Sequence, residues 1–177
     1  MKHFFCSLVL VFSLFFSATC LAATVSGNDP QTVLEIAKGF GSATLAADGL
    51  GDPKISGRID GVKYNLYFYN CKDHKNCDTL QFTAGWSGYA VTMEDINKWN
   101  SDMLYGKVYL DEDNDPILEL AVVAEEMPAA YLEEWFEWWQ VAVAEFTKTV
   151  LLPAKDKEET DSPAQEKDAT PQSSTRQ

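Results

Sequence analysis

Hydrophobic and polar residues follow two different periods along this chain, and the most regular pattern lies near its C-terminal end. After Pro128 the sequence runs to Val150 without glycine or proline. Apolar residues recur there at intervals of three and four: Leu132, Trp135, Phe136, Trp139, Val143, Phe146 and Val150. This is the spacing of an amphipathic α-helix, and it predicts a long final helix whose apolar face packs on the rest of the fold.

Shorter segments with a period of two precede this helix and predict strands. They cover residues 42–47, 54–59, 62–69, 79–86, 107–110 and 117–123, and several are rich in aromatic or β-branched side chains. Asp60-Gly61, between the second and third segments, is typical of a two-residue hairpin turn. The first four segments therefore predict an antiparallel meander, and the last two predict a further hairpin.

Two more helices are predicted from their start signals. Asp29 suits a helix N-cap and Pro30 the first helical position. Thr92 begins a sequence similar to a capping box, which predicts a short helix to Trp99, with Asn100 ending it in the left-handed conformation. Together these elements predict an α+β fold, in which an antiparallel meander sheet has helices packed on one face.

Residues 1–22 have the layout of a secretory signal peptide. Lys2 is followed by an apolar run and then by small residues, and the run is too short for a membrane span of about 20 residues. We expect cleavage after Ala22, or else after Ala23, which leaves nothing inserted in a membrane. A lipoprotein anchored at Cys20 is the alternative. The mature chain is then expected to be exported, either periplasmic or secreted.

Between the predicted signal peptide and a predicted C-terminal tail lies one predicted domain, residues 23–152. Residues 153–177 contain no large apolar side chain and are rich in charged residues, Ser, Thr, Gln and Pro. Such a segment buries too little surface to offset its conformational entropy, so a disordered charged tail is predicted.

Two cysteines remain after the predicted cleavage, Cys71 and Cys77, and His74 lies between them. Exported chains meet an oxidising environment, which favours a disulfide that clamps the ends of the two flanking strands. A metal site made by both thiols and His74, completed by Asp73 or Asp78, is the alternative. A redox-active pair normally has a shorter spacing.

The chain is strongly acidic, with a formal net charge of −13 at pH 7. This charge repels phosphate backbones and anionic membranes and is compatible with a cationic partner. Asp111, Asp113 and Asp115 have the spacing of a calcium loop, but Pro116 stands where such a loop needs glycine and Val122 where it needs a carboxylate. A solvated hairpin turn is predicted there, with cation binding as the alternative.

The final helix carries more aromatic side chains than one core-facing stripe requires. Tyr131 and Trp138 lie off that stripe or at its edge. Exposed aromatic residues on an amphipathic helix are a usual ingredient of protein–protein contacts. The candidate partner-binding residues are Tyr131, Trp135, Trp138 and Trp139, and the partner is a protein, a peptide or a second copy of the chain.

An ordered series of short sequences resembles the YbjN family of bacterial sensory transduction regulators. The series comprises Gly51-Asp52-Pro53, Tyr67-Phe68 ahead of Cys71, Cys77 leading into Leu80-Gln81-Phe82, Ala84-Gly85-Trp86, residues 96–100 (INKWN), residues 106–120 (GKVYLDEDNDPILEL) and the closing aromatic helix. The resemblance implies a fold like that of type III secretion chaperones, with a helix, a meander, a second helix, two strands and a long final helix. It implies no catalytic residues.

Catalytic chemistry has little support in the residues themselves. His74 is the only histidine after the predicted cleavage, and no glycine-rich phosphate loop is present. We therefore predict no catalytic residue, no cofactor and no metal site. The predicted function is that of an exported regulatory or accessory module that binds a protein or peptide. The alternative is a cation or small-ligand sensor that uses His74 with nearby acids, or the Asp111–Asp115 turn.

Overall fold

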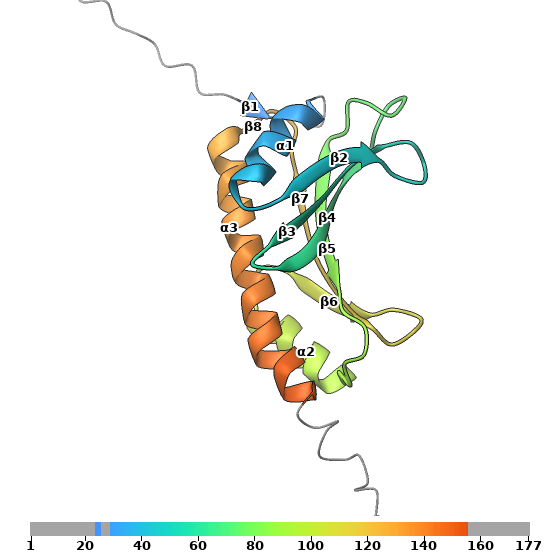
Figure 1. Cartoon of the computed structure of the whole chain (residues 1–177), viewed down its shortest axis with the longest axis vertical. Coiled ribbons are helices and arrows are strands. Elements are labelled where there is room, and N and C mark those ends of the chain that lie inside the picture. The colour runs from blue at the N-terminus through green and yellow to red at the C-terminus, as the bar shows by residue number, and fades with distance from the viewer. Residues whose placement is uncertain (1–23, 26–28, 156–177) are drawn as a thin grey trace, which may run out of the picture.

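Helices and antiparallel strands follow one another in the predicted order (Figure 1). The computed structural model describes residues 24–25 and 29–155. The elements are β1 (Thr24–Val25), α1 (Pro30–Gly39), β2 (Ala43–Ala47), β3 (Pro53–Ile59), β4 (Val62–Tyr69), β5 (Thr79–Gly85), α2 (Met93–Asp102), β6 (Lys107–Leu110), β7 (Pro116–Val123), β8 (Met127–Pro128), α3 (Ala129–Phe146) and a π-helical turn, η1 (Thr147–Leu151).

Six of the strands form one sheet in the order β2-β3-β4-β5-β7-β6, and every neighbouring pair is antiparallel. Strands β2 to β5 form the predicted meander. Strand β7 pairs with β5, so β6 becomes an edge strand although it precedes β7 in sequence. The short strands β1 and β8 form a separate ladder that the sequence did not predict.

One face of the sheet is apolar and covered by helices. Alternate residues of β4, β5 and β7 are buried on this face: Tyr64, Leu66, Phe68, Leu80, Phe82, Ala84, Leu118, Leu120 and Val122. Helices α1 and α3 lie on the same side of the sheet, and α2 lies near the C-terminal end of α3 (Figure 1). The α+β architecture is thus confirmed.

Local signals in the sequence explain where α1 and the first hairpin lie. Asp29 caps α1, because its carboxylate accepts a hydrogen bond from the backbone N–H of Thr32 at 3.2 Å. Asp60 and Gly61 both have positive φ angles, 48° and 84°. A two-residue turn of this handedness matches the twist of the flanking strands, so β3 and β4 are joined as predicted.

Helix α2 is longer than predicted. Thr92 and Asp95 form the expected capping box, but the helix continues to Asp102 and Asn100 is helical. The prediction that Asn100 ends the helix is wrong, because its side chain is held by Val108 of β6 while its backbone continues the helix.

The final helix also extends further than predicted. Residues 152–155 remain helical after η1, and Ala154 is buried, so the helix passes the boundary expected at residue 152. The rest of the predicted tail and the predicted signal peptide lie outside the described residues. Within the described ranges, no helix combines the length and the apolar character that crossing a bilayer requires.

Candidate functional site

The aromatic side chains of α3 divide between the core and the surface. Tyr131 is 57% exposed and Trp138 is 46% exposed, whereas Trp135 is half-buried. Trp139 is fully buried, and its ring stacks on Phe82 of the sheet at 5.5 Å between centroids. Because Trp139 has no exposed surface, its inclusion among the candidate partner-binding residues is corrected.

The periodicity of the helix separates Trp138 from Trp139. Successive residues of an α-helix point about 100° apart, since one turn takes 3.6 residues. Trp139 follows Leu132 and Phe136 on the buried stripe, and Trp138 follows Tyr131 and Trp135 on the neighbouring stripe. The first stripe packs in the core, and the second faces outward.

The loop between α2 and β6 adds two residues to this exposed stripe. The ring of Tyr105 lies 4.8 Å from that of Trp138 and 5.4 Å from that of Trp135, measured between centroids. Leu104 beside it is 79% exposed. Sequence reasoning missed both, because they lie about 30 residues from α3 and only the fold brings them together.

We call this region the α3 aromatic surface and define it by Leu104, Tyr105, Tyr131, Trp135, Trp138 and Val141. Two hollows open on it, and both are lined by Tyr105 and Trp138. The first has a volume of about 120 Å³ and is almost wholly apolar, and the second has about 170 Å³ and includes Glu134. Hollows of this size accommodate single side chains, which suits the anchor residues of a protein or peptide partner.

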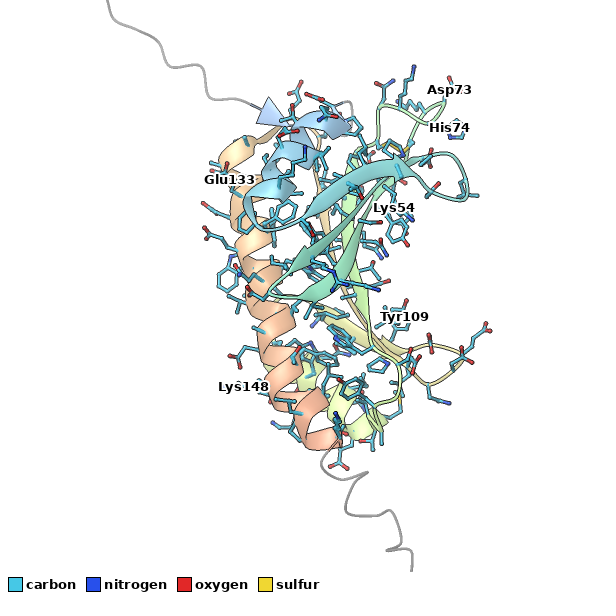
Figure 2. All side chains as sticks on the ribbon, in the orientation of Figure 1. Lys54, Asp73, His74, Tyr109, Glu133 and Lys148 are labelled. Atoms are coloured by element: carbon cyan, nitrogen blue, oxygen red, sulfur yellow. A yellow bond between two sulfur atoms is a disulfide. The ribbon has the colours of Figure 1, made fainter. Side chains whose placement is uncertain are left out.

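The surroundings of this surface are acidic. Glu133, Glu134 and Glu137 are exposed on α3, and Glu133 projects away from the sheet (Figure 2). Lys148 is the only basic residue between Ala129 and Leu151, and its Nζ lies 3.8 Å from a carboxylate oxygen of Glu145. The α3 aromatic surface therefore combines apolar hollows with a negative rim.

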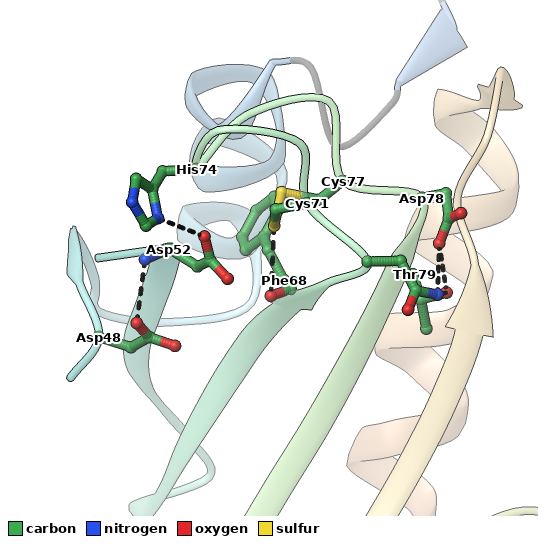
Figure 3. The surroundings of a disulfide bond; sticks show 9 residues. Asp48, Asp52, Phe68, Cys71, His74, Cys77, Asp78 and Thr79 are labelled. Carbon is green, nitrogen blue, oxygen red and sulfur yellow. Dashed lines mark hydrogen bonds and ion pairs between the residues drawn. A yellow bond between two sulfur atoms is a disulfide. The ribbon is translucent and has the colours of Figure 1, made fainter. Parts of the chain in front are cut away.

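A disulfide joins Cys71 and Cys77, with 2.07 Å between the sulfur atoms (Figure 3). It clamps the loop between β4 and β5, as the sequence predicted. Four residues around it have positive φ angles: Asn70, Asp73, His74 and Asn76. Asn, Asp and His are the residues other than glycine that adopt such angles most readily, so the local sequence suits the tight loop that the disulfide closes.

His74 is not surrounded by potential metal ligands. Its Nδ1 lies 2.9 Å from Oδ1 of Asp52 in the β2–β3 turn, while Asp78 accepts hydrogen bonds from Asn70 and Thr79 (Figure 3). These hydrogen bonds lower the pKa of Asp78. No group of three His, Cys, Asp or Glu side chains is arranged to hold a metal ion within residues 24–25 and 29–155.

In the acidic turn between β6 and β7, the carboxylate of Asp111 accepts hydrogen bonds from backbone N–H groups of the turn itself. Oδ1 of Asp111 accepts hydrogen bonds from the N–H groups of Asp113 and Asp115, at 3.0 and 2.9 Å. Asn114 has a φ of 62°, and the N–H of Asp111 donates to the carbonyl of Asp115. This is the geometry of a side-chain-supported hairpin turn.

The fold and this surface define an α+β protein whose sheet is covered by helices on one side and whose last helix exposes aromatic residues. A family profile described as "Putative bacterial sensory transduction regulator" matches residues 29–151. The chain belongs to the YbjN family. No curated protein matches it in sequence.

Proposed function

We propose that this chain is an exported, non-enzymatic regulatory or accessory module that binds a protein or peptide through the α3 aromatic surface. The observation that carries the proposal is the cluster of Tyr105, Trp135 and Trp138, whose rings lie beside two hollows on the outside of the fold. The regulatory description of the family is consistent with such a role.

The charge around the surface specifies the chemistry of the partner. A segment with an aromatic or aliphatic anchor flanked by Lys or Arg would fill a hollow and meet the acidic rim. A second copy is a poorer fit, since a symmetric dimer places the same patch of each copy together. The glutamates of both copies, Glu133, Glu134 and Glu137, would then share one interface, and like charges in an interface oppose association.

The proposed export rests on residues 1–22 and on the disulfide. Cys71–Cys77 supports it, because structural disulfides persist mainly in oxidising compartments. Fractionation of cells followed by a free-thiol assay on the native protein tests it. A cytoplasmic chain with an intact leader and two reduced thiols contradicts the export part of the proposal.

Binding is tested with two synthetic peptides that share one Phe anchor, one flanked by lysines and the other by glutamates. We expect the lysine peptide to bind and to change the tryptophan fluorescence. Trp138→Ala should weaken this binding by about tenfold or more, as expected for a central aromatic contact. Leu50→Ala is the matched control, because Leu50 is 80% exposed in the β2–β3 turn, outside the surface.

Equal affinity for the two peptides, or no effect of Trp138→Ala, contradicts the proposal. Light scattering on the same samples tests whether a second copy of the chain occupies the α3 aromatic surface. A stable dimer that Trp138→Ala dissociates assigns the surface to a second copy instead. A photo-crosslinker at Tyr131, used in native cells, then identifies the natural partner for the same affinity measurements.

A further inference from the structure

The face of the sheet opposite α3 carries an unbroken row of polar residues. Following the strand register, Thr44, Ser56, Asn65, Thr83, Glu119 and Lys107 lie side by side across all six strands. Lys54 and Tyr109 project from this face as well, away from α3 (Figure 2). One polar, solvated face is ordinary for an antiparallel sheet, so the row alone does not mark a site.

A hollow of about 650 Å³ lies over one end of the polar row. Ser42, Thr44, Ser56, Asn65 and Thr83 contribute hydroxyl and amide groups to its lining. Arg58 and Lys63 line it too, and they stand directly opposite each other on β3 and β4. The volume is within the range of small-molecule sites, about 300–1,000 Å³.

The two cations of the hollow lack acidic partners among the described residues. Arg58 donates from Nη1 to the backbone carbonyl of Gly61 at 2.8 Å, and Lys63 is exposed. No Asp or Glu belongs to the lining in the part of the chain that the structure describes. In a chain of net charge −13, two adjacent cations that form no ion pair among the described residues are a local reversal of charge.

The polar groups next to these cations are ordered and partly unused. The Ser56 hydroxyl donates to Oδ1 of Asn65 at 2.7 Å, which directs the amide nitrogen of Asn65 away from Ser56. The hydroxyl of Thr83 is buried and has no hydrogen-bond partner among the described residues. Buried polar atoms are nearly always paired. The Thr83 hydroxyl is closed to solvent here, so a ligand in the hollow would pair with it only after a rotation about χ1 that turns it toward the hollow.

We propose that this hollow binds a small polyhydroxylated anion, of the class of sugar phosphates and sugar acids. Arg58 and Lys63 would hold the phosphate or carboxylate group, since charge-assisted hydrogen bonds to these groups are the strongest available here. Asn65, Thr83 and Ser56 would pair with the hydroxyl groups of the ligand. A larger polyanion, such as an acidic peptide or a nucleic acid, would extend beyond the hollow over a surface that repels it.

Isothermal titration calorimetry on the purified protein tests this with glucose 6-phosphate, glucuronate, glucose and inorganic phosphate. We expect at least one of the two sugar anions to bind about tenfold or more tightly than both glucose and inorganic phosphate. Lys63→Gln and Arg58→Gln should each weaken that binding by about tenfold or more. Lys75→Gln, on the disulfide loop, is the control of equal charge change and should leave the affinity unchanged.

Thr83→Val separates a binding role from a structural one. Valine matches threonine in shape and suits a strand, so the variant should fold with undiminished stability. Loss of the hydroxyl should nevertheless weaken binding by about three- to tenfold. A preference for glucose 6-phosphate identifies a phosphate anion and a preference for glucuronate a carboxylate, and both support the proposal.

Four results overturn it. One is the absence of binding by both sugar anions. Another is binding of glucose or inorganic phosphate as tightly as the sugar anions. A third is binding that Lys63→Gln leaves intact. The fourth is a short polyglutamate peptide that binds more tightly than the sugar anions and displaces them, which assigns the face to an acidic peptide. The exposed side chain of Lys63 makes no hydrogen bond among the described residues, so its variant is expected to fold even if Arg58→Gln does not.

Discussion

Asn100 and Val108 exchange two hydrogen bonds, each 2.9 Å long. The Asn100 amide nitrogen donates to the Val108 carbonyl, and the Val108 N–H donates to the Asn100 amide oxygen. Val108 belongs to β6, the edge strand, and these are the backbone groups that face away from β7. The Asn100 side chain thus takes the hydrogen bonds that a further strand would make with Val108. It anchors α2 to the sheet and blocks edge-to-edge association at this position.

Replacing Asn100 therefore tests how α2 is attached to the sheet. Asn100→Ala removes both bonds and leaves a buried backbone pair unsatisfied, so we expect it to lower the free energy of unfolding by about 1–3 kcal/mol. Asn100→Asp keeps an acceptor for the Val108 N–H and loses the donor, and it should have an intermediate effect. Urea unfolding measures both variants, and wild-type stability of Asn100→Ala would show that the exchange contributes nothing.

The disulfide should stabilise the fold chiefly by constraining the unfolded chain. Closing the short loop between Cys71 and Cys77 corresponds to about 2 kcal/mol on the chain-entropy estimate. Reduction should therefore lower the free energy of unfolding by about that amount and loosen the His74–Asp52 contact. Urea unfolding with and without a reducing agent measures the first effect, and hydrogen exchange of the loop measures the second.

A variant without either thiol provides the control for reduction. Cys71→Ala combined with Cys77→Ala should match the reduced protein and should not respond to the reducing agent. If the reduced wild type is as stable as the oxidised protein, the loop is held by its backbone hydrogen bonds, such as those between Lys72 and Lys75, and the disulfide is dispensable.

Most elements could be predicted from sequence because their signals are local. Asp29 caps α1 by accepting a hydrogen bond from the N–H of Thr32, only three residues away. Asp60-Gly61 determines the β3–β4 hairpin through the conformation of these two residues alone. The order of β5, β7 and β6 could not be predicted, because β7 reaches β5 across the intervening helix. Pairing between distant segments depends on the whole core and leaves little trace in any one segment.

The candidate site was predicted in part for the same reason. Helical spacing identified Tyr131 and Trp138 as surplus to the core, and the structure exposes both. Tyr105 was missed because a single Tyr in a loop carries no periodic signal, and its contact with Trp138 depends on how α2 and β6 dock. The hollow over the sheet was missed because its lining comes from β2, β3, β4, β5 and β7, and only the assembled sheet places Thr44 and Thr83 near the two cations of the β3–β4 hairpin.

Acid should weaken the N-terminal cap of α1. The hydroxyl of Thr32 is the main cause that lowers the pKa of Asp29 below its usual 3.8, and the Thr32 backbone N–H adds to it. A carboxyl whose pKa falls on folding contributes stability at neutral pH, and this contribution is lost as the pH falls below the unfolded value through the lower folded one. Asp29→Asn keeps an N-cap without the charge, so its difference from wild type should shrink steadily with acidification.

Urea midpoints of the two proteins between neutral pH and about pH 2.5 measure this difference. Asp60→Asn, in the first hairpin turn, serves as a comparison at a position that caps no helix. A constant difference between Asp29→Asn and wild type over the whole range would mean that the Asp29 charge does not act on α1.

The buried hydroxyl of Tyr64 should lower the free energy of unfolding, because it has no hydrogen-bond partner among the described residues. Tyr64 is packed against Phe82, Phe136 and Trp139, and its hydroxyl is buried without a hydrogen-bond partner among the described residues. Burial raises the pKa of this hydroxyl to about 12. Tyr64→Phe keeps the ring and removes the unpaired group, so we expect stability at neutral pH to stay constant or to rise by up to about 1 kcal/mol.

The same group should make the wild type sensitive to alkali. An acid whose pKa is raised by folding is still protonated in the folded protein when the unfolded chain has lost its proton, so stability declines between pH 10 and about pH 12. Tyr64→Phe lacks this decline, and its advantage over wild type should therefore grow at about pH 11. Tyr67→Phe, three residues along β4 and therefore on the opposite face, is the control. A Tyr64→Phe variant that is less stable than wild type at neutral pH would show that the hydroxyl has a partner in solution.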